Sequence, residues 1–258
     1  MHFFQTSFII VSMTTIYAIF ISALKELPMD NFQKMTKTQL IYFILMSVAS
    51  GLMIGIGGAA SLLANNLLGS WGRLVGSFLF ALGIFAIVTY EMKLFTGMIP
   101  YIPKMGIKNT WRLVVCFLGN IVGVAVIAFF VYFSPIKDNV VPQAQNLISE
   151  KLNAELWGVR ALCSSMLCGA LITLSVWSVK YAPKKNLSAT LGVVLPIMVF
   201  AFCGFDHSIA NMLYFYYLGE ISWRVVGYCA LCVVGNILGG VILPLIVLLH
   251  RHSDTHEH

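Results

Sequence analysis

The sequence predicts an all-α integral membrane protein with six transmembrane helices, arranged as a 3+3 inverted repeat whose second and fifth helices are broken. Three observations lead to this fold class. Hydrophobic residues make up 59% of the 258 positions and charged residues only 10%, against about 25% charged residues in soluble domains. A Gly-Asn-Ile motif occurs once in each half of the chain. Each half also carries an interrupted apolar stretch, at residues 91–97 and at residues 203–212.

Six apolar stretches are long enough to cross a bilayer, which takes about 20 helical residues. They cover residues 40–63, 75–101, 110–133, 156–179, 189–218 and 225–249. An uncharged stretch at residues 5–24 lacks the features of a signal peptide, and it is either a seventh span or an amphipathic helix lying along the membrane. We therefore expect three parts: an N-terminal segment and linker at residues 1–38, a six-span domain at 39–250, and a polar tail at 251–258.

The charges between these stretches predict the orientation of the chain. Basic residues are concentrated in the loops of one side: Lys25, Lys34, Lys37, Lys104, Lys108, Arg112, Lys180, Lys184, Lys185 and Arg251. Because cytoplasmic loops carry the excess of lysine and arginine, we expect a multi-pass protein of the cell membrane with both ends of the six-span core in the cytoplasm. The net charge of +6 is scattered over short loops, so no nucleic-acid partner is expected.

An internal repeat relates the third span to the sixth. Residues 119–123 read Gly-Asn-Ile-Val-Gly, and residues 235–239 read Gly-Asn-Ile-Leu-Gly. Three spans per half is an odd number, so the second half enters the membrane from the opposite side, which makes the repeat inverted. The paired glycines allow close helix packing. Asn120 and Asn236 are buried amides that need partners, and unwound backbone in the broken helices could supply them.

The interruption in the fifth span contains two ionisable residues. Asp206 and His207 lie in a stretch that is otherwise apolar from residue 189 to 218. Ionisable groups at that depth cost roughly 2.5 to 3.5 kcal/mol each and mark function by default. The alternative is a core histidine that only satisfies a carbonyl group. The membrane setting favours the functional interpretation.

Broken helices expose backbone groups that are tolerated only beside protein or a water-lined cavity. Breaks at Gly97 in the second span and near Gly204 in the fifth would together form a small polar island between apolar walls. His207 would supply a titratable proton, and Thr96 and Ser208 would supply hydroxyl groups. Such an island suits a small, singly charged solute that can exchange a proton.

These motifs resemble those of the formate/nitrite transporter family. The resemblance rests on Leu-Phe-Thr at residues 94–96, on Gly-Phe-Asp-His-Ser-Ile-Ala-Asn-Met at 204–212, and on the two Gly-Asn-Ile blocks, and it covers about residues 35–251. It implies a channel domain of six spans in an aquaporin-like protomer, and a homopentamer with one pore per subunit. It also implies passive or proton-coupled passage of small monovalent anions or their conjugate acids, such as formate, nitrite, hydrosulfide or lactate.

The resemblance also implies roles for single residues. His207 matches the central histidine of the family, and Thr96 matches its loop threonine. Ser208 and Asn211 of the same motif join them in the expected substrate pathway. The apolar constrictions of the family correspond to Leu94, Phe80, Phe200 and Ile172.

Two further positions follow from the same comparison. Lys151 is the match for a lysine of the family that draws anions into the vestibule. An alignment with the family pattern that is counted back from Trp177 without gaps, however, places Asn153 at this position. Gly169 stands where the family usually has an asparagine facing the histidine, and the missing side chain favours a less demanding solute such as hydrosulfide. We expect Lys151 to concentrate the anion, and His207 or water to supply the proton, because a neutral acid crosses an apolar ring at far lower cost than an anion.

Other functions fit the sequence less well. A neutral-solute channel of the aquaporin type predicts two Asn-Pro-Ala motifs, and the chain has none. A membrane-embedded enzyme would need Asp206 and His207 to face each other, whereas adjacent helical residues point about 100 degrees apart. The six cysteines all fall in apolar stretches, which indicates neither a disulfide framework nor a metal site. No enzymatic activity, cofactor or metal is therefore expected, and the histidine-rich tail is taken as a solvated end.

Overall fold

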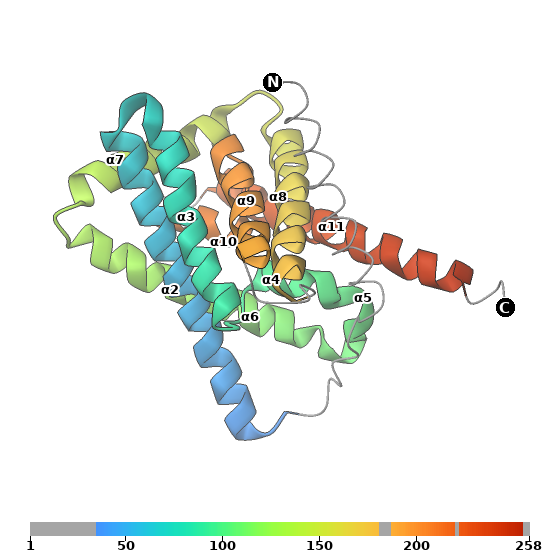
Figure 1. Cartoon of the computed structure of the whole chain (residues 1–258). Coiled ribbons are helices and arrows are strands. Elements are labelled where there is room, and N and C mark those ends of the chain that lie inside the picture. Colours follow the sequence, from blue (N-terminus) through green and yellow to red (C-terminus); the bar gives the residue numbers. More distant parts are fainter. Residues whose placement is uncertain (1–34, 181–186, 220–221, 255–258) are drawn as a thin grey trace.

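The structure is a computed structural model that describes residues 35–180, 187–219 and 222–254 (Figure 1). Every regular element within these residues is helical. In chain order they are α2 (Lys37–Leu67), η1 (Gly69–Trp71), α3 (Gly72–Thr89), α4 (Phe95–Met98), η2 (Ile99–Tyr101), α5 (Ile102–Met105), η3 (Ile107–Asn109), α6 (Trp111–Tyr132), α7 (Lys137–Asn153), α8 (Trp157–Lys180), α9 (Leu187–Cys203), α10 (Ser208–Tyr216) and α11 (Trp223–Asp254).

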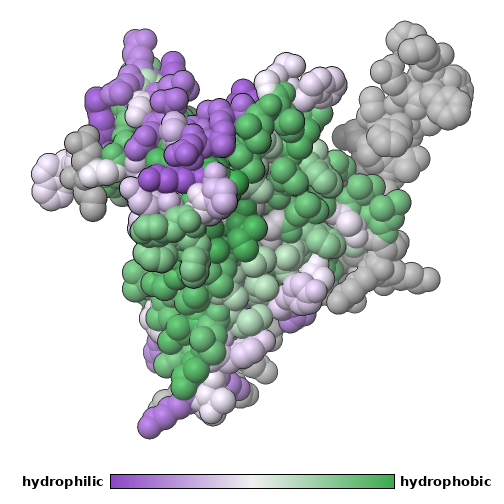
Figure 2. Space-filling view, turned by 90° about the vertical axis from the view of Figure 1, so that its left-hand side faces the viewer, coloured by the Kyte–Doolittle hydropathy of each residue, from purple (hydrophilic) through white to green (hydrophobic). Residues whose placement is uncertain are grey.

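Five helical stretches are long and apolar enough to cross a membrane: Lys37–Leu67, Gly69–Thr89, Ile107–Tyr132, Trp157–Val179 and Trp223–Val247. The pair α9 and α10 makes a sixth if it is counted as one span, bent by 47° at its break. Figure 2 shows a broad hydrophobic surface with hydrophilic residues gathered at one end of the molecule. The prediction of an all-helical, multi-pass membrane protein is confirmed.

The packing of the helices follows the predicted repeat. In the first half α2 packs against α3 and α6, and in the second half α8 packs in the same way against α9 and α11. The halves meet where α3 lies beside α9 (Figure 1). Equivalent glycines make the close approaches: a Cβ atom on Gly123 would clash with the carbonyl of Val48, and one on Gly239 with the carbonyl of Met166.

Both predicted breaks are present, and the first overlaps the predicted interruption at residues 91–97 but lies before Gly97. In the second span α3 ends at Thr89, and the helix resumes at α4, so that Gly97 lies inside α4 and not at the break. The break instead covers residues 90–94, and Glu91 within it has a φ of 53°. In the fifth span the break lies at Gly204, as predicted, with a φ of 74°. Only glycine adopts this left-handed conformation without steric cost.

Helix α7 was not predicted, because the region between the third and fourth spans was treated as a loop. Its buried residues recur at every fourth position, Val140, Ala144, Ile148 and Leu152, and face the rest of the protein. This amphipathic spacing was the available signal. The helix packs against α2 and α10 at one end of the molecule (Figure 1), and it carries Lys151.

The last helix extends into the predicted polar tail. Helix α11 continues through Asp254, so residues 251–254 of the predicted polar tail are helical. Apolar residues and good helix formers precede this point, and no proline or glycine interrupts the helix between residues 245 and 254. The predicted N-terminal stretch at residues 5–24 and the last four residues lie outside the described residues.

The α8–α11 contact provides a test of the repeat packing. Replacing Gly239 by Ala forces a methyl group into the backbone of Met166, and such overpacking costs about 1 to 3 kcal/mol. We expect a lower midpoint of thermal unfolding in detergent. Gly158→Ala is the matched control, because its Cβ would lie 3.4 Å from the flexible end of Leu231. Equal midpoints for the two variants would contradict the packing described.

Candidate functional site

A single amide side chain holds the first break in place. Asn120 of α6 donates from Nδ2 to the carbonyl oxygens of Ser47 (2.7 Å) and Lys93 (2.9 Å). Its Oδ1 accepts the backbone N–H of Phe95 at 2.8 Å. The amide therefore satisfies the unwound backbone on both sides of Leu94 and ties it to α2.

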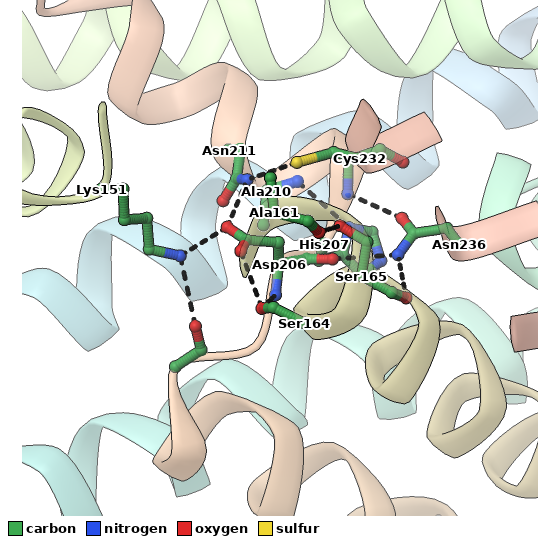
Figure 3. A network of polar contacts seen from close by, with 12 residues as sticks. Lys151, Ala161, Ser164, Ser165, Asp206, His207, Ala210, Asn211, Cys232 and Asn236 are labelled. Atoms are coloured by element: carbon green, nitrogen blue, oxygen red, sulfur yellow. Dashed lines mark hydrogen bonds and ion pairs between the residues drawn. The ribbon is translucent and has the colours of Figure 1, made fainter. Parts of the chain in front are cut away.

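Asn236 of α11 holds the second break through the equivalent bonds (Figure 3). Its Nδ2 donates to the carbonyl oxygens of Ser165 (2.8 Å) and Asp206 (2.9 Å), and its Oδ1 accepts the N–H of Ser208 at 2.8 Å. This amide brackets His207, as Asn120 brackets Leu94. The expectation that unwound backbone supplies the partners of both asparagines is confirmed.

Leu94 and His207 therefore occupy the same position in the two halves of the repeat. Both are buried. The two breaks meet between them: Thr96 Oγ1 lies 3.1 Å from His207 Nε2. Residues 111 positions apart in the chain are thus joined by one hydrogen bond, and a polar contact links the two halves of an otherwise apolar core.

The hydrogen bonds of His207 define which ring nitrogen carries the proton. His207 is the N-cap residue of α10, and its Nδ1 accepts the N–H groups of Ile209 (3.2 Å) and Ala210 (3.1 Å). An accepting Nδ1 carries no proton, so the neutral ring is protonated at Nε2. Nε2–H then donates to Thr96 Oγ1, which leaves the hydroxyl proton of Thr96 for a third group.

This arrangement disfavours a second proton on His207. A proton on Nδ1 would face two N–H groups at the N-terminus of α10, where the helix dipole is positive. Loss of the Nε2 proton would leave an imidazolate anion in an apolar site, which is also costly. His207 is therefore positioned as a hydrogen-bond donor through Nε2–H.

Aromatic rings surround the imidazole. Phe200 of α9 stacks on His207 with ring centroids 5.8 Å apart, and Phe80 of α3 presents its ring at 6.5 Å and a steep angle. The two phenylalanines touch each other at 5.6 Å. Leu94 and Ile172 are buried in the same apolar core. Two of the four predicted constriction residues thus contact His207, and the other two lie in the surrounding core.

A charged network lies beside the second break (Figure 3). Lys151 Nζ, from α7, lies 2.6 Å from Asp206 Oδ1 and donates to the carbonyl of Gly204 at 3.2 Å. The same oxygen of Asp206 accepts from Asn211 Nδ2 at 2.9 Å, and its other oxygen accepts from Ser164 at 2.7 Å. The Asp206 side chain is 4% exposed and that of Lys151 is 20% exposed. Asp206 is therefore fully paired despite its depth.

This network changes the picture of two predicted site residues and adds one that was not predicted. Lys151, expected as a free vestibule cation, is held by Asp206, while Asn153 is exposed. The amide nitrogen of Asn211, expected in the pathway, is engaged by Asp206 and by the sulfur of Cys232. Ser164 was not predicted. It comes from α8, a span without a motif, and no spacing in the sequence connects it to Asp206.

Gly169 and Ser208 have different surroundings. Gly169 points at α11, and a Cβ atom there would clash with the carbonyl of Asn236. The prediction that Gly169 leaves space opposite His207 is wrong, because the position is filled by the backbone of a packed helix. The Ser208 hydroxyl is buried and has no hydrogen-bond partner among the described residues.

Fold and site together define a multi-pass membrane transport protein in which two broken helices meet at one polar contact. The sequence model of the family "Formate/nitrite transporter" matches residues 24–250. The chain belongs to this family. The family consists of transporters, which confirms the expectation that the protein is not an enzyme.

Several curated proteins are similar to the chain. The uncharacterized transporter YrhG of Bacillus subtilis is 24% identical, over 88% of this chain and 92% of its own length. The probable formate transporter of Methanothermobacter thermautotrophicus is 25% identical, over 77% and 84%. The formate channel FocA of Escherichia coli K12 is 26% identical, over 69% and 66%.

Two solved structures share the fold. One is described as a pentameric formate channel with formate bound and has a TM-score of 0.67, 17% identity, and coverage of 87% of this chain and 100% of that one. The other is described as an FNT family ion channel and has a TM-score of 0.69, 20% identity, and coverage of 92% and 95%. These similarities support the inverted-repeat fold described above.

The bonds of Asn236 lead to a prediction about stability. Asn236→Leu keeps the volume but leaves the N–H of Ser208 and the carbonyl of Asp206 unsatisfied in an apolar site. Each buried unsatisfied group costs about 1 to 3 kcal/mol, so the variant should unfold at a clearly lower temperature. Asn66→Ala is the control, since that amide bonds Asn139 at the exposed surface. An unchanged midpoint for Asn236→Leu would refute the role described.

The ion pair leads to a second prediction. Lys151→Met leaves Asp206 charged and nearly buried, and breaking such a pair costs about 3 kcal/mol or more. Adding Asp206→Asn removes the stranded charge, so the double variant should regain most of the lost thermal stability. A double-mutant cycle of unfolding midpoints measures this coupling, and purely additive effects would speak against the pair.

Proposed function

We propose that the protein is a passive or proton-coupled channel for small monovalent anions or their conjugate acids, with the Thr96–His207 contact as its central point. The hydrogen bond of 3.1 Å between these two residues carries the proposal. His207 lies against the rings of Phe80 and Phe200, so the contact joins polar groups of both breaks beside two aromatic rings.

The chemistry of this contact suits a solute rich in hydrogen-bond acceptors. With Nδ1 of His207 engaged by α10, a solute that reaches the contact can accept from the hydroxyl of Thr96, and from Nε2–H where it replaces Thr96 as the acceptor. Formate and nitrite offer oxygen lone pairs and no strong donor. Moving a bare anion past the surrounding rings costs far more than moving its neutral acid. We infer that the solute takes a proton from water before it passes and is oriented by these two donors.

The names of the relatives favour formate as the first solute to test. Two of the similar proteins are described as formate transporters or channels, and one of the similar structures as a formate channel. The orientation of Gly169 removes the earlier reason for preferring hydrosulfide, because a residue that packs against α11 does not widen the passage. Nitrite, hydrosulfide and lactate remain the comparison solutes. The unpaired hydroxyl of Ser208 supports its place beside the pathway.

We further propose a homopentamer with one pathway in each subunit. The similarity to a pentameric channel supports this assembly, as does the wide hydrophobic surface in Figure 2. The positions of the basic loops support a cell-membrane location with both ends of the six-span core in the cytoplasm. The matched residues 24–250 support a channel domain over most of the chain, with the N-terminal segment and the C-terminal tail outside it.

Flux into proteoliposomes tests the proposal. The purified protein should carry formate faster than empty liposomes, and flux at fixed total formate should rise as the pH falls. Thr96→Val removes one donor at nearly constant shape, and loss of about 1.4 kcal/mol of interaction predicts about tenfold slower flux. Thr173→Val is the matched control, because the Thr173 hydroxyl bonds the carbonyl of Gly240, outside the candidate site. A folded protein that moves none of the four solutes would refute the proposed function.

His207→Asn separates the two proton sources. Asparagine is a good N-cap, so α10 is kept while Nε2–H is lost. If water supplies the proton, flux falls but keeps the pH dependence of the wild type. A changed pH dependence would instead assign proton delivery to His207 and contradict the role derived from its Nδ1 bonds.

A further inference from the structure

We propose that Arg73 is the cation that gathers the anion at the mouth leading to the second break, and that Lys151 is a positioning residue for Asp206. This inference rests on the proposed anion transport and deepens it. The resemblance to the family implied that Lys151 attracts the anion, and the structure favours Arg73 for this role.

Two cations from different helices converge on Gly204. Lys151 Nζ donates to its carbonyl oxygen at 3.2 Å. Arg73, at the start of α3, approaches from another side: a Cβ atom on Gly204 would lie 3.1 Å from Arg73 Nη2. Gly204 is the third residue before His207. Both positive charges therefore lie beside Gly204, a few residues along the chain from the Thr96–His207 contact.

The two cations differ in how much of their charge is neutralised. Lys151 forms an ion pair with Asp206, and the pair together carries no net charge. Arg73 is exposed, and no described carboxylate forms an ion pair with it. Its guanidinium stands 5.7 Å from the centre of the Phe202 ring. An aromatic face holds a cation in place without cancelling its charge. The field that an approaching anion meets is therefore that of Arg73.

The remaining contacts of Lys151 agree with a positioning role. Its Nζ binds the carbonyl of Gly204 and the carboxylate of Asp206, two residues of the break that contains His207. Asp206 is in turn tied to Asn211 and Ser164. A lysine released to meet a free anion would leave Asp206 charged and nearly buried, which is costly. An anion that takes over Lys151 would have to displace this carboxylate.

An attracting charge has a defined kinetic signature. It raises the local anion concentration but does not change the rate at which a bound solute passes the Thr96–His207 contact. Removing it should therefore raise the formate concentration that gives half-maximal flux, with little change in the maximal flux. One exposed unit charge predicts an effect of about two- to fivefold at low salt. The effect should shrink as salt screens the charge.

The experiment measures formate flux into proteoliposomes against formate concentration, at ionic strengths of about 20 mM and about 200 mM. Arg73→Gln should raise the half-saturating concentration about two- to fivefold at the lower ionic strength. At the higher ionic strength it should leave this concentration nearly unchanged. Arg73→Lys should behave as the wild type. Arg224→Gln is the matched control, since Arg224 also lies over an aromatic ring, that of Trp157, at 5.6 Å. It should leave both quantities unchanged.

The outcomes separate this inference from the proposed function. If the wild type carries formate and Arg73→Gln shows the same half-saturation and salt dependence, the inference about Arg73 is wrong and the transport function stands. If Arg73→Lys shows the same defect as Arg73→Gln, shape and not charge is responsible, and the inference is also overturned. Thermal unfolding in detergent checks each variant. Should Arg73→Gln not fold, Arg73→Met replaces it, because its stem can still pack on Phe202.

Discussion

The structure depends on satisfying unwound backbone inside a membrane. A helix interrupted at bilayer depth leaves N–H and C=O groups without partners, and hydrocarbon offers none. Asn120 and Asn236 meet this demand with one side chain per break, each donating two hydrogen bonds and accepting one. Close glycine contacts then bring α6 against α2, and α11 against α8, so that each amide reaches its break.

The two halves of this repeated scaffold differ in the residue that the asparagine amide brackets. The residue bracketed by the amide is Leu94 in one half and His207 in the other. At His207 the start of α10 engages Nδ1 and leaves Nε2–H to meet Thr96 from the opposite half. The same helix end that fixes the orientation of the ring also disfavours its charged form. A scaffold that holds backbone in place thereby sets the protonation state of its central side chain.

The roles of the charged residues beside the second break also depend on their partners. Asp206 is too deep to remain charged alone, and the basic residue within its reach is Lys151 on α7. In this pair the positive charge of Lys151 stabilises the buried carboxylate of Asp206. Arg73 rests on Phe202 and keeps its charge for the solvent side. The identity of a basic residue is therefore a poor guide to its role until its partners are known.

By itself the sequence determined the all-helical membrane fold, the inverted repeat and the family, and it predicted two breaks that bring Thr96 and His207 together, because hydrophobic length and motif spacing are properties of the local chain. Only the tertiary structure decided that the first break precedes Gly97, that Gly169 faces a helix, and that Lys151 is paired. These features depend on which groups from distant segments come within bonding distance. Spacing along one segment carries no information about them, since the partners lie on other helices.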